Sequence, residues 1–150
     1  MIHLEHANIT VKDIDVARDF LLQAVPEFAL RHEGQVDLEG YKKRWMHIGN
    51  EHQYIAIEEV TLDRELKREA YRDIGVNHIG FVTEDLTALI KRLNDAGYEQ
   101  LDLRVEGSSR RRAYFVDPTG FEWEFVEYLS DDPKKRNDYF PEKNKVSQIS

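Results

Sequence analysis

Three side chains in this sequence, His6, His78 and Glu124, could together bind a divalent metal ion. Two imidazoles and one carboxylate form a ligand set that leaves coordination positions open for water or a substrate. No local spacing brings these residues together, because each belongs to a different part of the chain. They become a metal centre only if the fold carries their three strands to one face of a sheet.

An internal repeat predicts such a fold. The segments HANITVKDIDVARDFLLQAV and HIGFVTEDLTALIKRLNDAG match at an offset of 72 residues, which pairs His6 with His78 and Asp13 with Asp85. Each segment reads as a short strand, an Asp at the N-cap position, and a helix with its apolar side chains on one face. Strand, cap and helix therefore occur twice in the same order.

The second half of each unit also repeats. RWMHIGNEHQYIAIEEV matches RAYFVDPTGFEWEFVEY at an offset of 68 residues, which pairs Arg44 with Arg112. Each reads as strand, tight turn and strand, and a further strand is expected within 28–39 and within 98–106. The repeated unit is βαβββ, and the predicted fold class is α+β.

These units define the expected organisation of the chain. One domain should cover residues 1–130, with modules at about 1–60 and 76–130. The join, 61–75, reads as a short charged helix and linker, which Thr61 or Asp63 could cap. Residues 131–150 read as a polar, partly disordered tail in which Tyr139 and Phe140 could dock.

The stretch DPTGFEWEFVEY fixes the orientation of the last predicted strand. Asp117 to Gly120 has the composition of a type I turn. Alternation along 121–128 then directs one face toward the core and the other away from it. The core face carries Phe121, Trp123 and Phe125, and the other face carries Glu122, Glu124 and Val126.

Alternation also orients the first strand of each unit. A helix covers only one face of each antiparallel sheet, and two units side by side would join into a curved mixed sheet with the helices outside. Ala7 and Ile9 are the apolar set that should face a helix, so His6 faces the concave cup. By the same parity His78 and Glu124 face the cup, and the three predicted metal ligands share one face.

Bulk composition excludes several function classes. The chain has 150 residues, a net charge of −8 and no cysteine. The acidic balance gives no general affinity for nucleic acid, and the lack of cysteine removes disulfides and thiolate sites. No apolar run reaches membrane-spanning length and the start does not resemble a signal peptide, so we expect a cytoplasmic protein without membrane contact.

The repeated pattern resembles the vicinal oxygen chelate superfamily, which includes glyoxalases, extradiol dioxygenases, fosfomycin-modifying thiol transferases and bleomycin-resistance proteins. The resemblance covers roughly residues 1–129 and is strongest in HANITVKDIDVARDF, NHIGFVTEDL and YFVDPTGFEWEFVEY. The last is similar to the family's closing turn, in which a metal-binding Glu follows the DP-x-G glycine by four residues. The resemblance implies His6, His78 and Glu124 as the ligands.

One position departs from the glyoxalase I pattern. Glyoxalase I enzymes have a fourth ligand, a Glu that also moves a proton, and the repeat offset assigns it to Ala56. Alanine can do neither, which argues against ordinary glyoxalase I activity. Glu58 lies two residues further along the same face and could replace it only if the strand bulges. Tyr54 and Glu58 are the candidate catalytic residues.

Other residues are assigned by parity. Arg112 and Tyr114 should face the cup, where Arg112 could hold an anionic group of a substrate; SSRRR, residues 108–112, could equally be an exposed loop. His47 and Trp45 are expected on the helix side. His32 and His52 fall in a predicted loop and turn.

Two function classes follow. The first is a metalloenzyme acting on a small oxygen-rich substrate with Fe, Mn, Ni, Zn or Co as a Lewis acid: a lyase or isomerase, a thiol transferase or an extradiol-type dioxygenase. No further cup histidine is evident for the acid–base step of ring cleavage, which weakens the dioxygenase reading. The second class is a metal-free binding protein of the bleomycin-resistance kind. A homodimer is expected in both cases.

Overall fold

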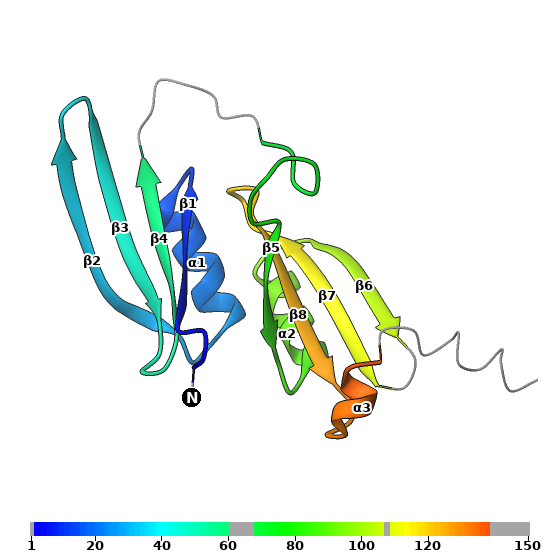
Figure 1. The fold of residues 1–150 in the computed structure, drawn as a ribbon. Coiled ribbons are helices and arrows are strands. Elements are labelled where there is room, and N and C mark those ends of the chain that lie inside the picture. Colours follow the sequence, from blue (N-terminus) through cyan, green and yellow to red (C-terminus); the bar gives the residue numbers. More distant parts are fainter. Residues whose placement is uncertain (1, 61–67, 107–108, 139–150) are drawn as a thin grey trace, which may run out of the picture. The chain divides into compact units, whose positions relative to one another are not determined.

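The computed structural model describes residues 2–60, 68–106 and 109–138 (Figure 1). The chain forms two compact units, one of residues 1–77 with 117–121 and the other of 78–116 with 122–150. Each unit contains a four-stranded mixed sheet and a helix in the order βαβββ, as the repeat predicts. The predicted fold class is confirmed.

In the first unit, the strand order is β1-β4-β3-β2, and α1 packs against β3 and β4. Strand β1 runs parallel to β4, and the other neighbours are antiparallel. The elements are β1 (His6–Val11), α1 (Ile14–Ala24), β2 (Ala29–Leu38), β3 (Tyr41–Gly49) and β4 (Tyr54–Val60).

The second unit repeats this topology with the order β5-β8-β7-β6, and α2 packs against β7 and β8. A short helix follows its last strand. The elements are β5 (His78–Val82), α2 (Leu86–Asp95), β6 (Gln100–Glu106), β7 (Arg110–Val116), β8 (Glu122–Tyr128) and α3 (Pro133–Arg136).

Both predicted N-caps are present. The Asp13 carboxylate accepts hydrogen bonds from the backbone N–H groups of Asp15 and Val16, both at 3.1 Å. The Asp85 carboxylate accepts one from Ala88 at 2.9 Å. These bonds satisfy amides of the first turn that have no partner within the helix, so both helices begin where the sequence predicts.

Each helix buries its apolar stripe against one face of its own sheet. In the second unit, the Trp123 side chain is fully buried between strands and helix, as predicted. The buried set of the first unit includes Ile14, Ala17, Phe20, Leu21, Met46, Ile48 and Ile57, and that of the second includes Leu86, Leu89, Leu93, Ala113, Phe115, Trp123 and Phe125. The apolar core of each unit therefore uses only the helix-facing side of its sheet.

Residues Asp117 to Gly120 form a turn closed by a backbone hydrogen bond. The Gly120 N–H donates to the Asp117 carbonyl at 2.9 Å, and the buried Asp117 carboxylate accepts from the N–H groups of Thr119 and Phe121 at 2.8 Å and 3.1 Å. Gly120 has a φ of 91°, a conformation that favours glycine. This turn sets the start of β8 and hence the position of Glu124.

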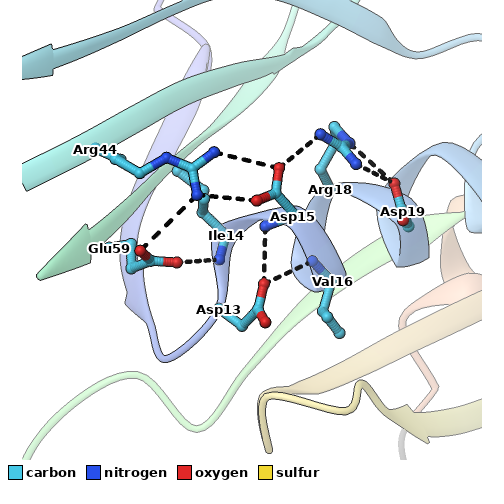
Figure 2. A network of polar contacts seen from close by, with 8 residues as sticks. All are labelled: Asp13, Ile14, Asp15, Val16, Arg18, Asp19, Arg44 and Glu59. Carbon is cyan, nitrogen blue, oxygen red and sulfur yellow. Dashed lines mark hydrogen bonds and ion pairs between the residues drawn. The ribbon is translucent and has the colours of Figure 1, made fainter. Parts of the chain in front are cut away.

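A network around Arg44 joins α1 to its sheet (Figure 2). The Arg44 guanidinium donates to the Asp15 carboxylate at 2.9 Å and lies 3.9 Å from Glu59. Glu59 in turn accepts from the Ile14 N–H at 2.8 Å. The pKa of Asp15 is lowered, chiefly by the hydrogen bond from Arg44 and further by the charges of Arg44 and Arg18.

An equivalent contact in the second unit corrects the sequence alignment of the repeat. Arg111 Nε donates to Glu127 at 2.6 Å, and its Nη1 donates to Thr87 at 3.2 Å. Arg111 thus connects strand β7, strand β8 and helix α2 as Arg44 connects their counterparts. Arg44 corresponds to Arg111 and not, as predicted, to Arg112.

The cause is a turn of different length. Gly49 pairs with Tyr54 across the β3–β4 turn, whereas Val116 pairs with Glu122 across the β7–β8 turn, which is one residue longer. A shift of one residue moves every side chain of a strand to the other face. The predicted helix-side positions of His47 and Trp45 are therefore wrong, and both lie on the face of the sheet opposite α1.

Three further predictions can be compared with the described residues. Residues 70–75 form turns and bends, but 61–67, which include Thr61 and Asp63, lie outside the described residues, so the helix expected in the join stays a prediction. In the tail, residues 133–136 are helical, and Tyr139 and Phe140 lie outside the described residues. Arg110 to Arg112 belong to β7 and not to an exposed loop.

Candidate functional site

Four of the predicted site residues meet on one face of the second sheet. The Glu124 side chain accepts a hydrogen bond from the Tyr114 hydroxyl at 2.8 Å and one from Arg112 Nη1 at 3.2 Å, both at Oε1. Its Oε2 lies 3.0 Å from His78 Nε2. Glu124 is only 8% exposed. A buried carboxylate surrounded by three polar partners is a feature of functional sites as well as of ion-pair networks.

The sheet register explains this meeting. Tyr114 lies opposite Glu124 on β7, and Gly80 lies beside it on β5. A Cβ atom at Gly80 would lie 3.6 Å from Glu124 Oε2, so the glycine leaves space next to that oxygen, beside the contact with His78. Oε1 is thus held by Tyr114 and Arg112, and Oε2 is directed toward His78.

The Tyr114 hydroxyl is kept protonated. Burial raises the pKa of Tyr114 to about 12, and the hydrogen bond to Glu124 and its charge act in the same direction. The phenol is therefore a stable donor at neutral pH and holds the carboxylate in one orientation. Two guanidinium groups, those of Arg104 and Arg112, lie 5.4 Å and 6.0 Å from the Tyr114 ring centre.

Both first-strand histidines have a carboxylate beside Nδ1. His78 Nδ1 lies 3.6 Å from Glu122 Oε1, and His6 Nδ1 lies 3.0 Å from Glu5 Oε2. In His6, the carboxylate at Nδ1 favours a proton on that nitrogen, which leaves the Nε2 lone pair for a metal; His78 has in addition Glu124 Oε2 at 3.0 Å from its Nε2. The two histidines share this arrangement although they belong to different units.

The complete three-ligand set stays a prediction. His6 belongs to the first unit, whereas His78 and Glu124 belong to the second. Within either unit, the described residues contain no group of three or more His, Asp and Glu side chains that could hold a metal ion. The predicted centre therefore requires ligands from both units.

The first sheet carries the predicted catalytic residues, Tyr54 and Glu58, on either side of Ala56. Strand β4 pairs continuously with β1 and β3, without a register shift. No bulge therefore brings Glu58 to the position of Ala56, and the two Cα atoms stay about 7 Å apart along the strand. The condition under which Glu58 could replace the missing fourth ligand is not met.

Glu58 is held as an ionised group. Lys43 Nζ lies 2.8 Å from its carboxylate, and Asn8 donates to it at 3.2 Å. The hydrogen bond from Lys43 lowers the pKa of Glu58, with a smaller effect from Asn8. A carboxylate with a lowered pKa is a weaker proton acceptor than an unperturbed one.

Tyr54 lies between two imidazoles. Its ring stacks on His6 with centroids 4.6 Å apart at 14°, and His47 lies 4.6 Å from its centre. The guanidinium of Arg31 lies over the same ring at 4.5 Å. His47 has a lowered pKa because it is partly buried, and the charges of Arg31, His6 and His32 add to the effect.

The sequence did not assign Arg31, His32, Trp45 or His47 to this face. His32 was expected in a loop but lies in β2, paired with His47. A register shift between Leu30 and His32 makes Arg31 a bulge residue. Since a bulge redirects side chains, alternation alone could not predict that Arg31 reaches Tyr54. His52 lies in a turn as predicted, and its N–H donates to Asn50 at 2.9 Å.

Among the described residues, no helix is long and apolar enough to cross a membrane.

Comparison with solved structures gives the same fold at low sequence identity. A glyoxalase family protein of Bacillus cereus is 16% identical, with a TM-score of 0.71 over 87% of this chain and 96% of that chain. The fosfomycin resistance protein FosX of Listeria monocytogenes, solved with Mn(II) and dihydroxypropylphosphonic acid, is 21% identical, with a TM-score of 0.63 over 90% and 98%. The trypanothione-dependent glyoxalase I of Leishmania major is 18% identical, with a TM-score of 0.63 over 85% and 87%.

The curated proteins contain no match to this sequence. A family model does match: that of the Glyoxalase/Bleomycin resistance protein/Dioxygenase superfamily, over residues 3–125. The match covers both βαβββ units, including the strands that carry His6, His78 and Glu124. The chain is a member of the glyoxalase/bleomycin resistance protein/dioxygenase superfamily.

Proposed function

We propose that this protein is a divalent-metal-dependent enzyme that acts on a small oxygen-rich molecule, with His6, His78 and Glu124 as metal ligands. The observation that carries the proposal is the environment of Glu124. Its carboxylate is 8% exposed and held by Tyr114 and Arg112, on a sheet face that the apolar core does not use. Burying a charged group costs free energy, so a buried carboxylate is usually paired with other polar groups or binds a metal.

The available donors fit a divalent metal. His78 offers Nε2 beside Glu124 Oε2, and His6 and His78 each have a carboxylate next to Nδ1. Imidazole nitrogen and carboxylate oxygen suit Mn, Fe, Co, Ni and Zn, and do not select among them. When bound, the metal would act as a Lewis acid toward oxygen atoms of the substrate.

The side chains around Glu124 have separate roles in this proposal. Tyr114 and Arg112 fix Oε1, so that Oε2 keeps one direction. The guanidinium of Arg112 would in addition hold an anionic group of the substrate, and Tyr114 would line the binding site. Glu58, ionised and paired with Lys43, would act as a weak proton acceptor, and Tyr54 would contact the substrate at the first sheet.

Relatives support a metal-dependent activity and leave the reaction open. FosX was solved with Mn(II), and the Leishmania protein is a glyoxalase I. Ala56 argues against ordinary glyoxalase I chemistry here, because the alanine offers no carboxylate to serve as the fourth metal ligand and proton acceptor. An isomerase or lyase, a thiol transferase and an extradiol-type dioxygenase remain candidate reactions. We also propose a homodimer in the cytoplasm.

Elemental analysis of the purified protein tests the proposal. The protein is isolated without chelator or affinity tag, incubated with Mn, Fe, Co, Ni or Zn salts, and desalted. Near-stoichiometric metal should be bound by the wild type and by His52→Ala, a matched histidine control in the Asn50–Gln53 turn. His78→Ala and Glu124→Gln should lose it. Absence of metal from the wild type, or retention in both variants, would contradict the proposal.

A metal-free binding protein is the second candidate function. The observation that favours it is that three side chains, those of Tyr114, Arg112 and His78, contact the Glu124 carboxylate. Such a network is stable without a metal and could line a binding cup. A wild type without metal that still binds small molecules would favour this alternative.

A further inference from the structure

A continuous row of rings crosses the first sheet on the face opposite α1. The row contains one side chain from each strand and a second from β3: His6, Tyr54, His47, Trp45 and His32. Neighbouring ring centres are 4.6 Å, 4.6 Å, 5.1 Å and 5.4 Å apart. These distances lie in the range of aromatic pairs.

The row is not part of the apolar core. The core of this unit lies on the other face, where Met46 and Ile48 alternate with Trp45 and His47 along β3. Trp45, His47 and Tyr54 are half-buried, whereas Met46 and Ile48 are fully buried. A solvent face usually carries charged or small polar side chains, so five rings in a row suggest a binding surface.

Gly34 allows the indole of Trp45 to lie close to the sheet. Gly34 pairs with Trp45 across β2 and β3. A Cβ atom at position 34 would lie 2.7 Å from the indole ring atoms Cε2 and Cζ2, which is closer than non-bonded carbon atoms approach. The glycine thus makes room for the indole over strand β2.

The same face offers a cation. Lys43 is paired with Glu58 at 2.8 Å, but Arg31 pairs with no carboxylate among the described residues and lies over the Tyr54 ring at 4.5 Å. The bulge at Arg31 brings it to the rings, although the chain has a net charge of −8. A guanidinium beside a row of rings matches a flat ligand that carries an acidic group.

From this geometry we infer that the ring row is a binding platform for a planar aromatic acid. The aromatic part stacks on the Trp45 indole with its edge toward His47, whose ring is tilted by 52° to the indole, and its carboxylate or another anionic group contacts Arg31. The inference rests on the proposed function in one respect: it takes this face of the first unit as the substrate side. It adds the class of substrate, an aromatic ring bearing an anion.

Titration of the full-length protein with three probes tests the inference. The probes are naphthoate, its saturated analogue decahydronaphthoate and the uncharged naphthylmethanol. Affinity is measured by calorimetry, and the binding position by backbone amide chemical shifts. A chelator is present throughout, so the result does not depend on a metal. If naphthoate does not bind, the proposed metal centre is unaffected. If the protein binds no metal, the binding of naphthoate can still be measured.

Naphthoate should bind about tenfold more tightly than decahydronaphthoate, because only the aromatic probe can stack. Trp45→Leu should remove that preference, whereas Trp45→Phe should retain most of it. Arg31→Gln should remove the preference for naphthoate over naphthylmethanol. Tyr71→Leu, which changes an exposed aromatic residue outside the sheets, should have no effect.

Several results would overturn the inference. The first two concern affinity: naphthoate and decahydronaphthoate bind equally well, or Trp45→Leu keeps the wild-type selectivity while its amide spectrum shows that it is folded. The third is that the probe shifts only amide resonances of β5–β8. The fourth is that no probe binds at millimolar concentration.

Discussion

Tyr114→Phe should destabilise the protein and remove a specific pH dependence. The substitution deletes one oxygen atom, which donates to Glu124 at 2.8 Å from a side chain only 7% exposed. A hydrogen bond to a charged group contributes about 1.5–3 kcal/mol. Because Arg112 and His78 still contact the carboxylate, the expected loss in the free energy of unfolding is about 1.5–2 kcal/mol.

The raised pKa of Tyr114 gives an independent check. It lies at about 12 against an ordinary value of 10.0. A group with a raised folded-state pKa contributes stability that is present below its unfolded pKa and lost as the pH rises toward the folded one. Burial is the main cause of this shift and the hydrogen bond to Glu124 adds to it, so part of the stability of the wild type is expected to disappear between pH 10 and 12.

Urea unfolding followed by circular dichroism measures both effects. At pH 7 the midpoint of Tyr114→Phe should fall by about 1 M with an unchanged slope. The difference between wild type and variant should shrink as the pH rises from 10 toward 12, while Tyr71→Phe follows the wild type. A difference below about 0.5 kcal/mol at pH 7, or one that stays constant above pH 10, would mean that the Tyr114 hydroxyl does not stabilise the folded protein through Glu124.

Three further substitutions test the scaffold, each by urea unfolding. Asp15→Asn removes the partner of Arg44 and should lower the free energy of unfolding by about 0.5–1 kcal/mol. Because the pKa of Asp15 is lowered in the folded protein, this loss should be present above pH 3.8 and should disappear as the pH falls through the folded-state pKa. A loss that persists in acid would contradict this. Gly120→Ala should cost about 1 kcal/mol, because φ is 91° there, and a neutral effect would be inconsistent with that turn. Trp123→Ala, at a fully buried position, should cost about 3–5 kcal/mol, and a cost below about 1 kcal/mol would place this side chain outside the core.

The sequence predicted those features that depend on local chemistry or on strict alternation. Asp13 and Asp85 cap their helices because a carboxylate at that position satisfies free amides. Trp123 and Glu124 take opposite faces because β8 pairs regularly on both sides. The shared face of Glu124 and Tyr114 therefore follows from residue alternation alone.

Features that depend on loop length and bulges could not be predicted. His47 and Trp45 were assigned to the wrong face because the turn after β3 is one residue shorter than its counterpart after β7. A difference of one residue moves every side chain of the strand to the other face of the sheet. Arg31 reaches the ring row through a bulge that leaves no clear mark in the sequence. The ring row was missed for these two reasons.

Whether one metal ion contacts His6, His78 and Glu124 together can be measured by paramagnetic relaxation. One equivalent of Mn(II) is added to the labelled full-length protein, and paramagnetic broadening of amide resonances is measured. If the proposed centre exists, broadening should occur simultaneously around His6 on β1 and around His78 and Glu124 on β5 and β8, and it should be lost in Glu124→Gln. Broadening limited to one unit, or none at one equivalent, would contradict a centre shared by the two repeats.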